Sequence, residues 1–377
     1  MLLSLVALGL VLSPLPAGRA SVRAPHPLSA ERPVAPVAPQ TVGGPIEALI
    51  GAVAASKCGA INQLLVETKD KEAVLELVTE YANLMNAVNI ATSLHRLASL
   101  EKKNRAERDA LLRDARFEAL LTAVVKRADE FTPRQTADLL WSCATLRHWP
   151  PILLKPILLR VVHHLERKSF APHQLSIVTW AFATLECKPV NLLVAIEDQA
   201  KVACAEFNPQ NCANLLWGFA KLRQPTATLL PAVMKRLQNE KIFLQCKPVE
   251  VADIAYACAM MGTTEGESCS PDEARALLAH LSTLATPERY LSDFSSRQLV
   301  TLVWAHAKLD SRPPDATLAS WRDAVREADS QRQMQIADRL NLERSLERLG
   351  EECYGFWLPA KENAEEDAQK IGDPPQQ

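Results

Sequence analysis

Polar side chains that can hydrogen-bond to the edges of nucleic-acid bases recur along this chain at intervals of about 38 residues. Arginine, asparagine, glutamine and aspartate offer such donors and acceptors, and one set per repeated segment suits a modular reader of a single strand. The candidate base-contacting residues are Arg134, Asp138, His173, Gln210, Asn214, Lys221, Asp253, Arg297, Thr301 and Lys308. The alternative interpretation is a solvated helix face that binds nothing.

A second group of basic residues lies between these positions, in segments that follow proline-marked turns. Clustered Lys and Arg can neutralise phosphates, and each such contact adds to the salt dependence of binding. The candidate phosphate contacts are Arg160, Arg167, Lys168, Lys235 and Arg236. Scattered charges that only keep the protein soluble are the alternative. The adjacent His163 and His164 would point about 100° apart on a helix, which makes a poor metal site.

No pattern typical of an enzyme occurs in the chain. It lacks a glycine-rich phosphate loop, an HExxH metal motif and a GxSxG nucleophile motif. The nine cysteines include no CxxC pair, and most fall at small apolar positions of helical patterns, which predicts reduced thiols in a core. We therefore expect a protein without catalytic residues, cofactor or metal.

The elements that must position these residues are copies of one sequence block. Five stretches align without gaps: FTPRQTADLLWSCATL (131–146), FAPHQLSIVTWAFATL (170–185), FNPQNCANLLWGFAKL (207–222), CKPVEVADIAYACAMM (246–261) and FSSRQLVTLVWAHAKL (294–309). A sixth, degenerate copy is MNAVNIATSLHRLASL (85–100). One aromatic column runs through the five, at Trp141, Trp180, Trp217, Tyr256 and Trp304. The column flanks the apolar face, so a role in the repeat core is favoured over stacking on bases.

Each block begins like a helix and has two faces. In the first copy Thr132 is a candidate N-cap, Pro133 fits the first helical position and Gln135 completes a capping box, as Gln298 does for Ser295. We number the first residue of each block as position zero. Positions 5, 8, 9, 12 and 13 then form an apolar face, and positions 3, 7 and 14 lie opposite, with 4 and 11 beside them. The candidate base-contacting residues all lie at positions 3, 7 and 14.

Tandem blocks of this kind predict an all-α fold, a right-handed α-solenoid of about six helical hairpins with a helical C-terminal cap. The expected parts are a targeting segment and Pro-rich linker (1–44), an N-terminal helical region with one degenerate repeat (45–130), five hairpin repeats (131–316), a helical cap (317–358) and a disordered acidic tail (359–377). The aromatic cluster at Tyr354–Trp357 is expected to dock on the cap rather than to bind a partner.

The first 44 residues have the composition of an organellar address. The apolar run LLSLVALGLVL is long enough for a signal-peptide core and too short to span a membrane. The segment from Arg19 to Val42 is rich in Pro, Ala and Arg, with Glu31 as its one acidic residue. The two-part pattern predicts a plastid address that is removed, leaving a mature protein with no membrane anchor. A mitochondrial address and a simple secretory signal are the alternatives.

The net charge of −2 hides a gradient along the chain. Residues 131–250 hold 14 Lys and Arg against 8 Asp and Glu, whereas residues 310–377 hold 9 against 15. The basic middle of the chain can therefore attract a polyanion while the acidic end stays solvated.

The blocks resemble the octotricopeptide repeat, whose pattern runs roughly Pro-x-x-Leu-Ala-x-Leu-Leu-Trp-Ala-x-Ala-x-Leu; NPQNCANLLWGFAKL (208–222) is the closest copy. The degenerate copy is similar to the opening unit of FAST-kinase-like proteins and of helical-repeat subunits of the RNA-editing substrate-binding complex. The resemblance covers about residues 80–315. It implies helical hairpins that bind single-stranded organellar RNA and control its processing, stability or translation. No C-terminal RAP-type domain, which some relatives carry, is apparent.

Two functions from different classes are consistent with these features. The first is a non-catalytic RNA-binding repeat protein of an organelle, acting alone or with other subunits of a ribonucleoprotein complex. The second is a protein-interaction scaffold within such a complex, which the near-neutral total charge favours.

Overall fold

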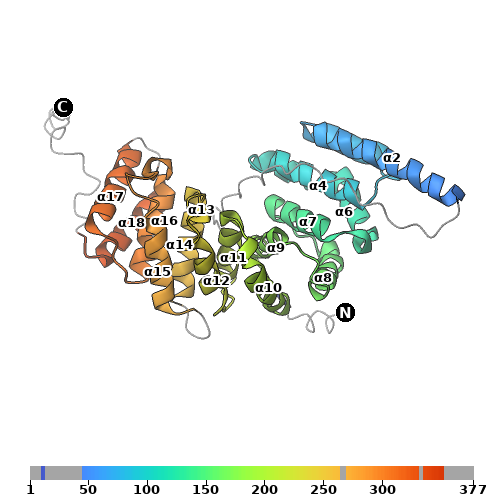
Figure 1. The fold of residues 1–377 in the computed structure, drawn as a ribbon. Coiled ribbons are helices and arrows are strands. Elements are labelled where there is room, and N and C mark those ends of the chain that lie inside the picture. The colour runs from blue at the N-terminus through green and yellow to red at the C-terminus, as the bar shows by residue number, and fades with distance from the viewer. Residues whose placement is uncertain (1–9, 13–44, 264–268, 331–333, 352–377) are drawn as a thin grey trace, which may run out of the picture. The chain divides into compact units, whose positions relative to one another are not determined.

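The computed structural model describes residues 10–12, 45–263, 269–330 and 334–351, and its fold is all-α as expected (Figure 1). The expected acidic tail, the cluster at Tyr354–Trp357 and most of the expected targeting segment lie outside the described residues. The chain divides into two compact units, Met1–Arg236 (unit 1) and Leu237–Gln377 (unit 2). Each unit is a stack of helical hairpins, which confirms the predicted solenoid architecture.

In unit 1 the first helices of successive hairpins form one continuous layer. These helices are α2 (Pro45–Glu67), α4 (Ala87–Glu101), α7 (Pro133–Leu146), α9 (Pro172–Thr184) and α11 (Pro209–Lys221). Each packs directly on the next in chain order (Figure 1). The hairpin that begins with α2 precedes the degenerate copy and carries no recognisable block. Unit 1 therefore has one more helical hairpin than the repeats in its sequence indicate.

The second helices of unit 1 form the other layer. They are α3 (Lys71–Glu80), α6 (Ala115–Lys126), α8 (Pro151–Glu166), α10 (Val190–Ala203) and α12 (Leu229–Leu237), with the short α5 (Arg105–Leu111) inserted before α6. Helix α3 packs on α6, α6 on α8, and α8 on α10. Short 3-10 turns, η1 (Ala128–Glu130) and η2 (Cys204–Glu206), lead directly into the first residue of the next block.

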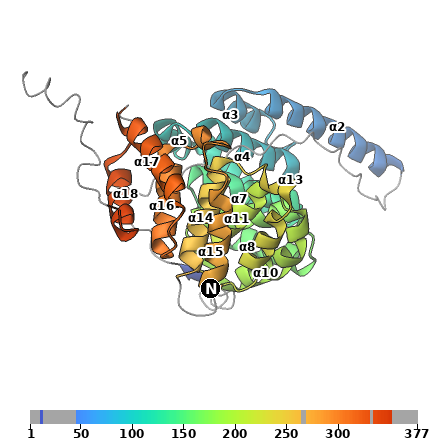
Figure 2. The same ribbon diagram turned by 60° about the vertical axis from the view of Figure 1, so that its left-hand side comes forward.

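Unit 2 repeats this arrangement. It contains α13 (Glu240–Phe243), α14 (Pro248–Met261), α15 (Pro271–Ser282), η3 (Leu291–Asp293), α16 (Ser296–Lys308), α17 (Asp315–Ser330) and α18 (Ile336–Arg348). Helices α14, α16 and α18 pack side by side, and α15 and α17 pair with α14 and α16 (Figure 2). Trp321 of α17 is fully buried, and its indole N–H donates to the carbonyl of Ala285. Helix α17 is therefore the second helix of the hairpin that α16 begins, the hairpin of the fifth aligned block.

In the part of the chain that the structure describes, one pair of short strands accompanies the helices, although the sequence predicted no strand. Strand β1 (Leu10–Leu12) pairs antiparallel with β2 (Cys187–Pro189), with Val11 opposite Lys188. Strand β1 belongs to the segment that the sequence predicts to be a removable address. None of the helices in the described part of the chain is both long and apolar enough to cross a membrane.

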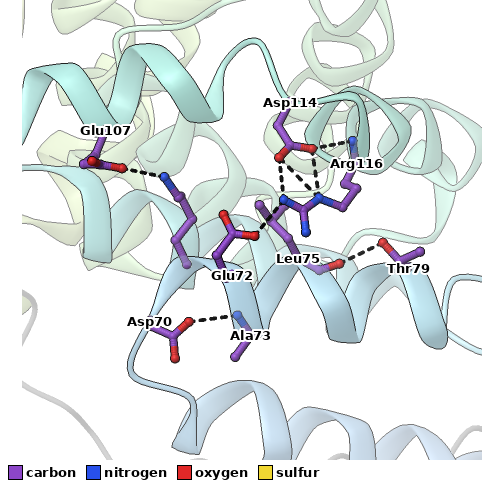
Figure 3. Close-up of polar contacts among 9 residues, drawn as sticks. Asp70, Glu72, Ala73, Leu75, Thr79, Glu107, Asp114 and Arg116 are labelled. Atoms are coloured by element: carbon purple, nitrogen blue, oxygen red, sulfur yellow. Dashed lines mark hydrogen bonds and ion pairs between the residues drawn. The ribbon is translucent and has the colours of Figure 1, made fainter.

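Ion pairs join the first hairpin to the second (Figure 3). Lys71 Nζ lies 2.7 Å from Glu107 Oε2, and the Arg116 guanidinium lies 2.8 Å from Glu72 and 2.6 Å from Asp114. The hydrogen bond with Arg116 lowers the pKa of Asp114. Because these groups are partly exposed, each pair contributes at most about 1 kcal/mol. They fix the position of α3 on α5 and α6, while packing of α2 on α4 holds the hairpin.

The start of every first helix is capped by the side chain at position 4 of its block. In all six copies this side chain accepts a hydrogen bond, 2.8–3.2 Å long, from the backbone N–H at position 1. The capping residues are Asn89, Gln135, Gln174, Asn211, Glu250 and Gln298. In the first copy the Thr132 hydroxyl also accepts a hydrogen bond from the backbone N–H of Gln135, which completes the predicted capping box. Five of the six are buried, so the expectation that position 4 lies beside the exposed face was wrong.

Four of the first helices, α7, α9, α11 and α16, end in a left-handed residue at position 16. Arg147, Glu186, Arg223 and Asp310 have φ between 47° and 53°. The next N–H then bonds back to the carbonyl at position 12, as from His148 to Cys143 at 2.9 Å. A side chain in this conformation costs about 1 kcal/mol relative to glycine. No glycine marks these four turns, so the residue types do not predict them.

Neighbouring first helices approach closely through small residues at position 11. Ser142, Ala181 and Gly218 are buried in unit 1, as are Ala257 and Ala305 in unit 2. A Cβ atom on Gly218 would lie 2.6 Å from Thr179 Cγ2 and 3.1 Å from the Thr179 carbonyl oxygen on α9. The expectation that position 11 lies beside the exposed face was therefore wrong, because each first helix is covered by its neighbours as well as by its own second helix.

Buried polar groups attach the second helix of a hairpin to its first. Arg160 Nε donates to the Phe131 carbonyl at 2.6 Å, and Arg236 Nε donates to the Phe207 carbonyl at 2.7 Å. His164 Nε2 lies 3.0 Å from the Phe131 carbonyl and donates to it, since that oxygen can only accept. Burial lowers the pKa of His164 to about 4, so this imidazole is neutral at pH 7.

Replacing Gly218 with alanine should destabilise unit 1. Overpacking against Thr179 costs about 1–3 kcal/mol, which exceeds the gain of about 1 kcal/mol in helix propensity. Gly59→Ala is the matched control, because a Cβ atom there meets nothing within 4 Å and should stabilise α2. Thr179→Ser removes the methyl group that clashes and should partly rescue Gly218→Ala. The urea midpoints of the four variants test this, and equal midpoints for both Gly→Ala variants would contradict it.

Stability should fall as the pH drops from about 6.5 toward 4, partly through His164. Its folded pKa lies below that of an unfolded histidine, so the unfolded chain binds a proton first. The expected loss in the free energy of unfolding is on the order of 2 kcal/mol. The His164→Gln variant should be less stable than the parent at pH 7.5, and its stability should depend less on pH. Urea unfolding at several pH values measures it, with His163→Gln as the control for losing an imidazole. A His164→Gln curve parallel to that of the parent refutes the assignment.

Candidate nucleic-acid interface

The stacked first helices bring positions 3, 7 and 14 of successive blocks together as a strip, which we call the polar stripe. In unit 1 the stripe crosses α7, α9 and α11, and in unit 2 it crosses α14 and α16. Arg134, His173 and Arg297, all at position 3, are exposed, whereas most residues at positions 7 and 14 are half-buried. The stripe is therefore a shallow surface with exposed cations toward the helix starts and partly covered polar groups farther along.

Arg134 and Asp138 form the first group of the stripe, one turn apart on α7. Arg134 Nε lies 3.8 Å from Asp138 Oδ2, and the Asp138 side chain is 28% exposed. Burial raises the pKa of Asp138 to about 6, while the Arg134 charge acts in the opposite direction. A carboxyl with this pKa is mostly ionised at pH 7 and takes up a proton in mildly acidic solution. In either state it can accept a hydrogen bond from a base amino group.

The rest of the stripe alternates between polar and apolar copies. Helix α11 presents the fully polar set Gln210, Asn214 and Lys221, all half-buried. On α9, position 7 is the buried Ile177, so the polar residues of that copy are His173 and the half-buried Thr184 at position 14. In unit 2, Asp253 of α14 is flanked by Val249 and Met260, while α16 presents Arg297, Thr301 and Lys308. The Thr301 hydroxyl donates to the Arg297 carbonyl and keeps only acceptor capacity.

The aromatic column lies beside the stripe but is largely covered. Trp141 is 5% and Trp180 is 6% exposed, whereas Trp217, Tyr256 and Trp304 are half-buried. Members of neighbouring copies stack on one another: His95 on Trp141 at 4.6 Å between ring centroids, and Tyr256 on Trp304 at 5.6 Å. Burial lowers the pKa of His95 to about 4, so its stacked ring is neutral. These rings serve as contacts between hairpins.

The candidate phosphate contacts on the second helices separate into two kinds. Arg160 and Arg236 are half-buried, and each commits its Nε–H to a carbonyl of its own hairpin. Arg167, Lys168 and Lys235 are exposed at the ends of α8 and α12. The sequence does not distinguish these kinds, because a structural arginine and a surface arginine have the same helical context.

No cluster of metal-ligating side chains appears among the residues that the structure describes. Among those residues, no three His, Cys, Asp or Glu side chains lie close enough together to hold a metal ion. His163 and His164 meet edge to face, with 5.4 Å between their ring centroids, and His164 donates to the Phe131 carbonyl. The residues of the polar stripe offer hydrogen-bonding groups and charge.

Two features shape the interface, and the sequence predicts one of them in part. Capping by the residue at position 4 was predicted for Gln135 and Gln298, and the structure shows it in every copy. The left-handed residue at position 16, by contrast, has no signal in residue type, since Arg, Glu and Asp all occupy it.

No family model matches the chain. Over 264 residues it is 23% identical to "RAP domain-containing protein, chloroplastic" of Oryza sativa subsp. japonica. The match covers 66% of this chain and 38% of the rice protein, so the chain spans well under half the length of that relative. The chain is thus a helical-repeat protein similar to a chloroplastic RAP domain-containing protein, and its assignment to the octotricopeptide repeats stays a prediction.

Proposed function

We propose that this chain is a non-catalytic, single-stranded RNA-binding repeat protein that acts in an organelle, in transcript processing, stability or translation. The observation that supports this proposal most strongly is the polar stripe, in which variable polar side chains lie at equivalent positions of helices stacked side by side. A fixed scaffold with one variable set per hairpin presents successive side chains to successive bases.

The organelle that we propose is the plastid. Two independent features support it: the composition of residues 1–44, and similarity to a rice protein described as chloroplastic. A mitochondrial location is the alternative. Octotricopeptide-type recognition would further explain why the block keeps its scaffold residues while positions 3, 7 and 14 vary.

Within the stripe, different residues have different tasks. Arg134 and Arg297 supply exposed positive charge that attracts the strand. Asn214 and Gln210 can form paired hydrogen bonds with base edges, most favourably with adenine. Because an array of about six units is short, we expect modest sequence preference, shared with any partner subunits.

A protein-interaction scaffold is the second candidate. The stripe contains Ile177, Val249 and Met260, and the chain has a net charge of only −2. An apolar and polar mixture of this kind also suits a bound peptide segment. This second function is favoured if substitutions in the stripe abolish binding of a partner protein and leave RNA binding unchanged.

Direct binding to RNA is the first test. The protein should bind fluorescently labelled oligouridine and a mixed-sequence single-stranded RNA at about 50 mM salt, and more weakly at about 200 mM. Arg134→Gln with Arg297→Gln should weaken binding several-fold, because two phosphate or base contacts are lost. The matched control is Arg113→Gln with Arg344→Gln, two exposed arginines outside the stripe. Absence of RNA binding by the parent protein, or equal binding by both double variants, rules out the proposed role.

The pH dependence of RNA binding is the second test. Asp138, with a pKa of about 6, becomes neutral as the pH falls from 7.5 to 5.5, so repulsion of the polyanion falls and binding tightens. Asp138→Asn should bind at pH 7.5 more tightly than the parent and show a smaller pH effect. Glu118→Gln, which removes an exposed carboxylate from α6, is the control. Identical pH profiles for the parent and Asp138→Asn would place Asp138 away from the RNA.

A further inference from the structure

The ends of the stacked first helices in unit 1 form a second surface, which we call the turn edge. It consists of positions 14 to 18 of the blocks of α4, α7, α9 and α11, where each chain leaves its first helix. Because these helices pack side by side in one layer, their ends follow one another along one side of unit 1. Lys188 Nζ donates to the Arg223 carbonyl at 2.9 Å, which joins two successive turns directly.

The turn edge is strongly basic. Its cations are Lys102, Lys103, Arg147, Lys188, Lys221 and Arg223, and its acids are Glu101 and Glu186. Glu101 is 8% exposed, so Glu186 is the acid that faces solvent. The corresponding turn at the end of α16 differs, because Arg312 is paired with Asp315 and Glu351, and Asp310 with Arg348. The excess of positive charge is therefore particular to unit 1.

The backbone holds cations outward at this edge. Arg147 and Arg223 occupy the left-handed position 16, at φ 52° and 49°, and both are exposed. Glycine adopts that conformation without strain, yet arginine stands there at two of the three first-helix ends of unit 1 that have it; Lys168, at the end of α8, is left-handed as well. Residues kept in a strained conformation are concentrated at functional surfaces.

Unused hydrogen-bonding capacity is concentrated at the same turns. Among the described residues, the neutral side-chain atoms that are buried without a hydrogen-bond partner are Thr145 Oγ1, Trp149 Nε1 and Thr184 Oγ1. All three lie at positions 14 or 18, two residues from a left-handed residue: Thr145 and Trp149 from Arg147, and Thr184 from Glu186. Buried polar groups almost always have partners, so these three atoms are hydrogen-bonding capacity that the fold itself does not use at the turns.

The second helices are poorer candidates for the same task. The Nε–H groups of Arg160 and Arg236 are taken by carbonyls, as described above. The exposed faces of α8 and α10 include Ile152 and Leu159, each about half exposed, and Val202, which is 79% exposed. Apolar side chains between the cations do not suit a phosphate backbone, whose contacts are charged and polar.

We propose that the turn edge of unit 1, rather than the second helices, binds the phosphate backbone of single-stranded RNA. This inference rests on the proposed RNA-binding function and assigns it a phosphate-contacting surface. Position 14 belongs to both surfaces, through Lys221, so a strand whose backbone follows the turn edge can turn its bases toward the polar stripe.

The experiment compares two triple variants of the full chain with labelled oligouridine over a salt series. The first removes turn-edge charge: Lys103→Gln, Arg147→Asn and Arg223→Asn, with asparagine chosen because it tolerates the left-handed conformation. The second removes the same charge from the second helices: Arg167→Gln, Lys168→Asn and Lys235→Gln, in which Lys168 is also left-handed, at φ 50°. Circular dichroism melting verifies that both variants remain folded.

The turn-edge variant should lose about 2 from the slope of log binding constant against log salt, roughly 0.7 for each lost phosphate contact. The second-helix variant should keep the parent slope. Glu186→Lys adds a cation to the edge and should steepen the slope and tighten binding, a gain that misfolding cannot produce. A slope lost only, or equally, in the second-helix variant overturns this inference while RNA binding by the parent stands. Absence of RNA binding by the parent overturns both proposals.

Discussion

The close approach of neighbouring first helices is the constraint on which the rest of the structure depends. Where Gly218 meets Thr179, there is no room for even one additional carbon atom. Small, fully buried residues at position 11 allow an equally close approach at Ser142 and Ala181 in unit 1 and, within unit 2, at Ala257 and Ala305. Because two helices at this separation bury most of their facing surfaces, the layer is stabilised by tight packing more than by any polar contact.

This packing also decides which residues are left for function. A first helix covered by its own second helix and by a neighbour on each side keeps only a narrow accessible strip, the polar stripe. The aromatic column, placed beside that strip, becomes a set of ring contacts such as His95 on Trp141. Besides the stripe, the end of each first helix remains accessible. There Arg147 and Arg223 have the left-handed backbone conformation, and their side chains are exposed to solvent.

The two accessible surfaces divide the work of holding a nucleic acid in the function that we propose. Charge on the turn edge acts on every phosphate equally and supplies affinity that depends on salt. Side chains such as Asn214 on the stripe act on individual bases and supply preference. A net charge near zero does not conflict with this arrangement, because the basic residues of unit 1 and the acidic residues near the C-terminus lie in different parts of the chain.

The sequence by itself determined the all-α hairpin architecture and the capping box at Gln135. Both follow from short-range patterns: the recurring block, and a side chain three residues from its N-cap. The tertiary structure alone decided that positions 4 and 11 are buried, and that Arg160 binds the Phe131 carbonyl. It also decided the left-handed turns and the pairing of β1 with β2. These features depend on which helices become neighbours and how closely they approach, and a helical periodicity in one segment carries no information about the surface that will cover it.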